Sequence, residues 1–437
     1  MKGIITVLSA ALFAFGIQHN LWALDTSKTL SLGRCLSIAA ENNKSVVIAK
    51  KAEDIAKRDI DIAYSGYLPR INAGLSHTFL NNEPEGKFGS LAVPQSQKSF
   101  NTFQVDIEQN IYDFGATSSR YNYAKTLMEL SRVETQKVKN DVSLSVAVTY
   151  FDALRAQRFR EVAEQEVKQM EGHLRVVQSL FKEGVITRND LLQAEVRLSD
   201  ARQRLLSAKD RQQVMRAYLN NLLNLPLNDK RPLSDEPDNI TIKDMIIDEL
   251  TKEAIENRPE VTALRKKIEA ERLVIEKEKT RYMPRIYGSL GYEYNENRYM
   301  VHQDEWSALF GIKINLYSGG ETKASVLKAE AQLSKTEEEL KKLKDDIRLE
   351  TVANYIRLND AYERIGVTKE AIRQAQENLR INEVRYKERV GIAVEVMDAQ
   401  SILTTARTNY YNALYDYRTN EAQLLSSVGK NIKDFYR

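Results

Sequence analysis

The side chains that most often perform chemistry in proteins, histidine and cysteine, are few in this chain and lie far apart. Its 437 residues contain one cysteine, Cys35, and four histidines: His19, His77, His173 and His302. No two of the histidines have the spacing of a metal-binding pair, and none lies close enough in sequence to activate Cys35 as a nucleophile. Gly319-Gly320 is not followed by the Lys-Ser/Thr of a phosphate-binding loop. The sequence therefore predicts no catalytic, cofactor-binding or metal-binding site.

Composition excludes some classes of protein and favours long helices. The chain has 64 Lys and Arg against 61 Asp and Glu, a formal net charge of +3, which is too small a surplus for a typical nucleic-acid-binding protein. No proline occurs in residues 95–225 or 285–437. Compact domains need turns, so two such stretches predict long helices and argue against a globular enzyme.

The N-terminus has the order of a secretory signal. Met1-Lys2 is followed by an apolar run over residues 3–17 and by Ala23, which predicts a signal peptide over residues 1–23. No other stretch is long and apolar enough to span a membrane as a helix, so a membrane-embedded mature chain would need a β-barrel. Cys35 follows Arg34, where a lipidation signal has a small residue, and we expect a packed thiol.

The mature chain contains an internal repeat. Tyr-Leu-Pro-Arg-Ile at residues 67–71 recurs as Tyr-Met-Pro-Arg-Ile at 282–286, a shift of 215, whereas later matches such as Lys182-Glu183 with Lys387-Glu388 have a shift of 205. A single ten-residue length difference between residues 71 and 110 explains both shifts. We predict a tandem duplication: a first repeat over 24–224, a proline-rich connector over 225–248 and a second repeat over 249–437.

Each repeat is expected to contain one β-hairpin between helices. Alternation of apolar and polar residues predicts two strands within residues 67–113, separated by a polar loop over 81–98, and two within 282–317. The apolar face includes Phe103, Val105, Ile107, Phe310, Ile312 and Ile314. Long helices follow at 117–181 and 321–386, interrupted only by Gly172 and Gly366, and each is followed by a shorter helix with a heptad pattern.

Four strands per chain cannot close a barrel, and open sheet edges are not tolerated in lipid. Because small outer-membrane barrels begin at about eight strands, the chain must pool its strands with copies of itself. Two copies would leave almost no bore, so a conduit favours three.

With these features in place, the sequence resembles the TolC-type outer-membrane efflux protein family. The resemblance rests on the two Tyr-x-Pro-Arg-Ile segments and on Asn-Ile-Tyr-Asp-Phe-Gly at 110–115 with Asn-Leu-Tyr-Ser-Gly-Gly at 315–320. Phe-Lys-Glu-Gly-Val at 181–185 and Tyr-Lys-Glu-Arg-Val at 386–390 form the third pair. The three motifs occur in the same order in both repeats, and the resemblance extends over nearly all of the mature chain.

The resemblance implies an α+β membrane protein: a homotrimer with a twelve-stranded barrel in outer-membrane lipid and a long α-helical, coiled-coil barrel in the periplasm. It implies a passive exit duct that works with a periplasmic adaptor (membrane fusion) protein and an inner-membrane pump or secretion ATPase. It implies no cofactor, no catalytic group and no nucleic-acid partner.

The resemblance also implies a gate at the periplasmic tip. The family's gate aspartate matches Asp190, its tyrosine matches Tyr386, and its two acidic rings match Glu395 and Asp398. These two acids are three residues apart and share one helix face, so in a trimer they would form two stacked rings of carboxylates, which attract cations. The gate arginine falls on Gly391, with Arg389 two residues earlier. A periplasmic coiled-coil adaptor or structural protein without a pore is the alternative, but an adaptor would have one hairpin between soluble β-domains.

Overall fold

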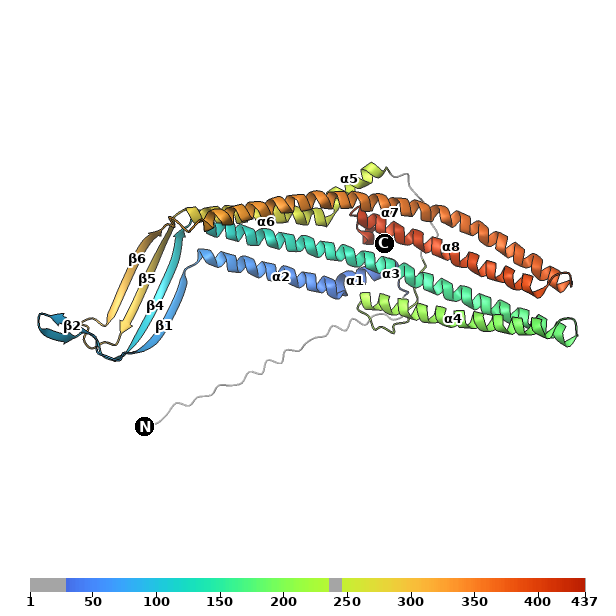
Figure 1. The fold of residues 1–437 in the computed structure, drawn as a ribbon, viewed down its shortest axis with the longest axis horizontal. Coiled ribbons are helices and arrows are strands. Elements are labelled where there is room, and N and C mark those ends of the chain that lie inside the picture. Colours follow the sequence, from blue (N-terminus) through green and yellow to red (C-terminus); the bar gives the residue numbers. More distant parts are fainter. Residues whose placement is uncertain (1–28, 236–245, 437) are drawn as a thin grey trace, which may run out of the picture.

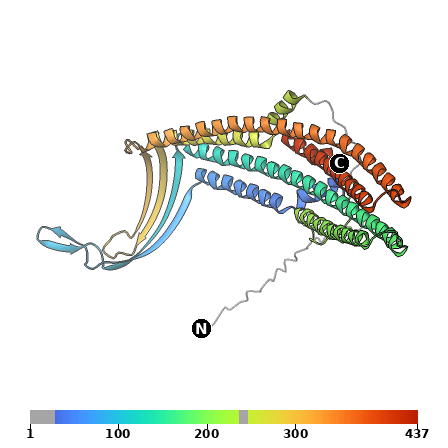
Figure 2. The same ribbon diagram turned by 45° about the vertical axis from the view of Figure 1, so that its right-hand side comes forward.

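The fold is elongated, with a β-sheet at one end and two helical hairpin tips at the other (Figure 1). The computed structural model describes residues 29–235 and 246–436, so the predicted signal peptide over 1–23 lies outside the described residues. Among the helices within these ranges, none is long and apolar enough to cross a membrane. Figure 2 shows the sheet curving away from the line of the helices.

The helices of the two halves match in length, pair by pair, as a duplication requires. The long helices α3 and α7 both have 67 residues, and the helices that return from the tips, α4 and α8, both have 35. The bounds in the first half are α1 Leu32–Asn42, α2 Lys44–Tyr64, α3 Ala116–Lys182 and α4 Arg188–Leu222. Those in the second half are α5 Ile247–Asn257, α6 Pro259–Lys279, α7 Glu321–Lys387, α8 Ala393–Ser427 and the short α9 Ile432–Phe435.

The helix expected before each hairpin is in fact two helices. Asn43 breaks the first one in an extended conformation (φ −62°, ψ 131°), and its side chain caps α2 by accepting a hydrogen bond from the Ser45 N–H at 2.9 Å. In the second half the break is at Arg258, which precedes Pro259. A proline disfavours helical geometry in the residue before it, which explains the break at Arg258. The break at Asn43 is stabilised instead by its capping side chain.

Four strands form one antiparallel sheet in the order β1-β4-β5-β6, which confirms the predicted four-stranded arrangement. Their bounds are β1 Arg70–Phe79, β4 Ser99–Tyr112, β5 Arg285–Asn295 and β6 Asp304–Lys313. The register joins Val105, Tyr292 and Trp306 in one row across three strands. Residues in one row share a face, so the apolar residues of all four strands lie on the same side of the sheet.

Two expectations about the strands were wrong. The loop over 81–98 holds a second hairpin, β2 Glu85–Phe88 and β3 Leu91–Pro94, and it accounts for the ten residues that the first repeat has in excess. The last strand ends at Lys313, so Ile314 lies outside it. The reason is that β6 is an edge strand whose final partner is Arg285, the first residue of β5.

The strand-to-helix crossings explain the glycines of the sequence motif. Gly115 and Gly320 precede α3 and α7 with φ values of 98° and 85°, a left-handed conformation that only glycine adopts without a steric penalty. At the first crossing the Asp113 carboxylate also accepts a hydrogen bond from the Thr117 N–H at 2.9 Å. These residues fix the direction in which each long helix leaves the sheet.

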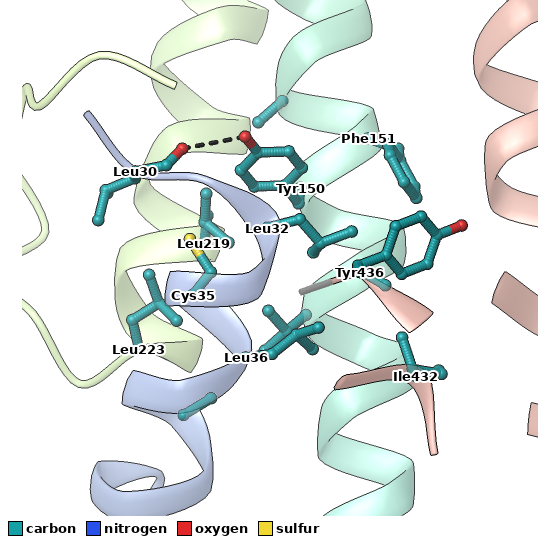
Figure 3. Packing of buried hydrophobic residues seen from close by; sticks show 14 of the residues in the cluster. Leu30, Leu32, Cys35, Leu36, Tyr150, Phe151, Leu219, Leu223, Ile432 and Tyr436 are labelled. Carbon is teal, nitrogen blue, oxygen red and sulfur yellow. Dashed lines mark hydrogen bonds between the residues drawn. The ribbon is translucent and has the colours of Figure 1, made fainter. Parts of the chain in front are cut away.

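The largest hydrophobic core lies midway along the molecule, where the two halves and the N-terminal segment meet (Figure 3). The Tyr150 hydroxyl has one proton to donate and two carbonyl acceptors within reach, that of Leu30 at 2.9 Å and that of Ser234. Leu30 also pairs with Leu233 of the connector in a parallel bridge. Cys35 is buried in this core as expected, and burial raises the pKa of its thiol to about 12.

Candidate functional site at the helical tips

The two helical tips end in the same way and face the same end of the molecule (Figure 1). After α3 the chain turns at Gly184 (φ 75°), and after α7 it turns at the duplicated position, Arg389 (φ 65°). In each case an N–H just past the turn bonds back to a carbonyl of the last helical turn, at 2.9 Å for Val185 to Leu180 and for Val390 to Arg385. Arginine adopts this left-handed conformation only at an energetic cost.

Asp190 lies at the start of α4, and its carboxylate caps that helix. Its carboxylate accepts hydrogen bonds from the Thr187 N–H at 3.0 Å and the Thr187 hydroxyl at 2.7 Å, and its N–H bonds back to that hydroxyl at 3.3 Å. This reciprocal arrangement is a capping box, which stabilises the helix start. Asp190 therefore has a structural role, the capping of α4, that is independent of any role in a gate.

Tyr386, at the end of α7, is buried with only 7% of its surface exposed, and its hydroxyl has no hydrogen-bond partner. Burial and, secondarily, the negative charge of Asp190 raise the pKa of this hydroxyl. The structure thus brings the two predicted gate residues into electrostatic range without joining them by a hydrogen bond. The Tyr386 ring also lies 5.5 Å from that of His173, centroid to centroid.

The two predicted ring acids lie at the start of α8 and differ in their surroundings. Glu395 forms an ion pair with Arg385 at 3.4 Å and accepts a hydrogen bond from the Ile392 N–H at 3.4 Å, whereas Asp398 is exposed. Gly391, where the family's gate arginine would fall, is tightly enclosed: a Cβ there would lie 3.2 Å from the Tyr386 nitrogen and from a Glu395 carboxylate oxygen. An arginine would not fit at this position without a shift of its neighbours.

One link between the tips was missed by the sequence reasoning. Arg389 of the second tip lies 3.9 Å from the Glu183 carboxylate of the first, N to O, in an exposed ion pair. Both residues lie in the paired segments 181–185 and 386–390, so the sequence marked their positions. Their contact could not be predicted, because residues 206 positions apart come together only through the packing of the hairpins. His173 was also missed; burial lowers the pKa of its imidazole.

Comparisons with known proteins agree with this architecture. The outer membrane efflux protein family matches residues 35–225 and 250–430. The chain is similar to the alkaline protease secretion protein AprF of Pseudomonas aeruginosa, with 24% identity over 74% of this chain and 69% of that one. It is similar to the outer membrane efflux protein BepC of Brucella suis, with 20% identity over 91% of this chain and 84% of that one.

Solved structures show the same fold. The outer membrane protein VceC of Vibrio cholerae superposes with a TM-score of 0.76 at 17% sequence identity, over 92% of this chain and 96% of VceC. The Campylobacter jejuni CmeC outer membrane channel superposes with a TM-score of 0.78 at 15% identity, over 91% of this chain and 85% of CmeC. Because the family match extends over most of both halves, the chain belongs to the outer membrane efflux protein family.

Proposed function

We propose that this chain forms the exit duct of a tripartite efflux or type I secretion system. As a member of its family it is a protein of the cell outer membrane that extends into the periplasm. The duct is a passive, homotrimeric conduit, gated at the helical tips and energised by an inner-membrane pump or secretion ATPase through a periplasmic adaptor. The names of its relatives, a protease secretion protein and an efflux protein, support this proposal.

The observation that carries the proposal is the four-stranded sheet. In the part of the chain that the structure describes, β1 and β6 each pair with a strand on one side only. The apolar face is widely exposed, with Leu75 78% and Phe310 81% accessible. Three copies would supply twelve strands, joining each β1 to a neighbouring β6, and would turn the apolar face toward lipid.

The mass of the folded complex in detergent tests this assembly. A trimer that converts to monomers only on heating, recovered with the outer membrane, is the expected result. A monodisperse folded monomer would contradict the proposal, because no lone chain can satisfy both sheet edges in lipid. Release of the protein with the soluble periplasm would favour the adaptor instead.

The gate is proposed to close where Asp190 and Tyr386 approach each other. Asp190 has acceptor capacity left beyond its capping box, and in the assembled tip the Tyr386 hydroxyl would donate to it. Tyr386→Phe and Asp190→Ala should then both raise single-channel conductance in planar bilayers. Thr187→Ala is the matched control, because it weakens the same helix cap by about 1 kcal/mol but leaves the carboxylate. If Thr187→Ala raises conductance as much as Asp190→Ala, the effect comes from the cap and the gate contact is refuted.

A further inference from the structure

A cavity of about 290 Å³ lies near the tips, between α3 of the first repeat and the α7–α8 hairpin of the second. Gly172, the lone glycine of α3, contributes to this space: a Cβ there would find no atom nearer than an Arg175 side-chain nitrogen at 3.8 Å. A glycine inside a helix costs about 1 kcal/mol relative to alanine. Gly172 therefore lowers the stability of α3 and leaves this space unfilled.

Three side chains with soft or borderline metal-binding atoms line this cavity: Met170 and His173 of α3, and Met397 of α8. A side-chain hydrogen bond between Gln169 and Gln400 fixes the register of the two antiparallel helices. One helical turn toward the tip from that bond, Met397 is level with His173. Met170 and His173 are three residues apart, so they are neighbours on one helix face.

Met170 and Met397 both line the space between α3 and α8. Both line the cavity described above and a second one of about 320 Å³, and no other residue lines both. Their exposed fractions are 7% for Met170 and 5% for Met397. Two buried thioethers, one from each repeat, thus line the same two cavities, and the imidazole of His173 lines the first of them.

The Nε2 atom of His173 is buried and has no hydrogen-bond partner. Thioether sulfur is a poor ligand for hard cations but suits soft monovalent ones such as Cu(I), and imidazole binds copper as well. We propose that this cavity binds a soft monovalent cation, Cu(I) or Ag(I), through the sulfur atoms of Met170 and Met397 and Nε2 of His173. A bound cation would join the first repeat to the second close to the tips.

The duplication distinguishes this site from ordinary core packing. At the duplicated positions the chain has Ala375 for Met170, Asn378 for His173 and Leu192 for Met397. None of the three donors is therefore kept at the duplicated position of the repeat. In residues 29–235 and 246–436 of a single chain, no group of three or more His, Cys, Asp or Glu is placed to hold a metal.

Calorimetric titration of the purified full-length protein with silver nitrate, in chloride-free buffer, tests the proposal. We expect one Ag(I) bound per chain. Met170→Leu, Met397→Leu and His173→Gln should each weaken binding at least tenfold, because each removes one donor. Exchanging methionine for leucine conserves volume, so these variants should remain folded. Competition with a Cu(I) chelator under reducing conditions gives the same test for copper.

Two control variants keep the test specific. Met215→Leu, a methionine of α4 outside both cavities, should bind Ag(I) like the wild type. Cys35→Ser should also bind normally, which excludes the thiol as the ligand. Failure of the wild type to bind Ag(I), or unchanged binding by the Met170→Leu/Met397→Leu double variant, would overturn the proposal. The test needs no channel activity, so its failure would leave the proposed duct unaffected.

Discussion

A charge placed at the centre of the apolar sheet face should prevent stable assembly. Leu290 is the middle residue of β5, and the register joins it in one row with Ile107 and Ala308. If this face meets lipid, Leu290 lies near the bilayer midplane. An arginine there should destabilise the assembled sheet by about 2–4 kcal/mol per chain, a factor of roughly 30 to 1,000 in the assembly equilibrium for each of the three chains.

The cost should fall with distance from the midplane. Ile312 pairs with Ile286, four residues from Leu290 along β5, which is about 13 Å at the rise of a strand. With a strand tilt of about 40°, this corresponds to roughly 10 Å of depth, near the edge of an apolar band about 25 Å tall. Ile312→Arg should therefore cost only about 0–1 kcal/mol, although it lies on the same face.

The urea concentration that dissociates the folded trimer, with the yield of heat-modifiable trimer in the outer membrane, measures these costs. Ser289→Arg is the matched control, since Ser289 precedes Leu290 and lies on the opposite face in the row of Glu108 and Leu309. It should assemble like the wild type. A Ser289→Arg chain that fails while Leu290→Arg assembles would show that the faces are reversed. Equal costs for Leu290→Arg and Ile312→Arg would refute the depth argument.

Three further predictions concern the tips and the core. Replacing both Glu395 and Asp398 with alanine should abolish cation preference and block by multivalent cations in planar bilayers; a double variant with wild-type selectivity would show that these acids are solvated. Arg389→Gly should relieve about 1 kcal/mol of backbone strain, because Gly184 has the same left-handed backbone at the duplicated turn, and should raise the melting temperature, since the exposed ion pair that it removes contributes little; a lower melting temperature would contradict this. Tyr150→Phe should lower the free energy of unfolding by about 0.5–1.5 kcal/mol, since it removes the hydrogen bond of the buried hydroxyl while the Leu30 carbonyl keeps the Ser234 N–H as a donor; an unchanged denaturant midpoint would contradict this.

Local patterns in the sequence were sufficient for much of the fold. Missing prolines predicted the long helices, and the structure has them at Ala116–Lys182 and Glu321–Lys387. Alternation predicted the four strands and which residues share a face, because that period depends only on backbone geometry. Gly115 and Gly320 marked the crossings because their left-handed backbone restricts the residue type.

The parts that could not be predicted either have a weak local signal or depend on partners distant in sequence. The β2–β3 hairpin consists of two four-residue strands, too short to give an alternating pattern. The capping role of Asn43 depends on a position in the helix that its residue type alone does not indicate. Met170 and Met397 line one cavity only because α3 and α8 pack in one register, and nothing local to either helix specifies that register.

The equal lengths of the paired helices constrain how this protein can change in length. Each residue removed from an α-helix rotates everything beyond it by about 100°, so one deletion in α3 would turn its tip-side contacts away from α4 and α8. A change of seven residues rotates the helix by nearly two whole turns and preserves the packing face. It must occur in both helices of a hairpin to keep the tip closed, and in both hairpins to keep the tips level. The 67- and 35-residue helices of the two halves are therefore expected to lengthen or shorten together, in steps of about seven residues.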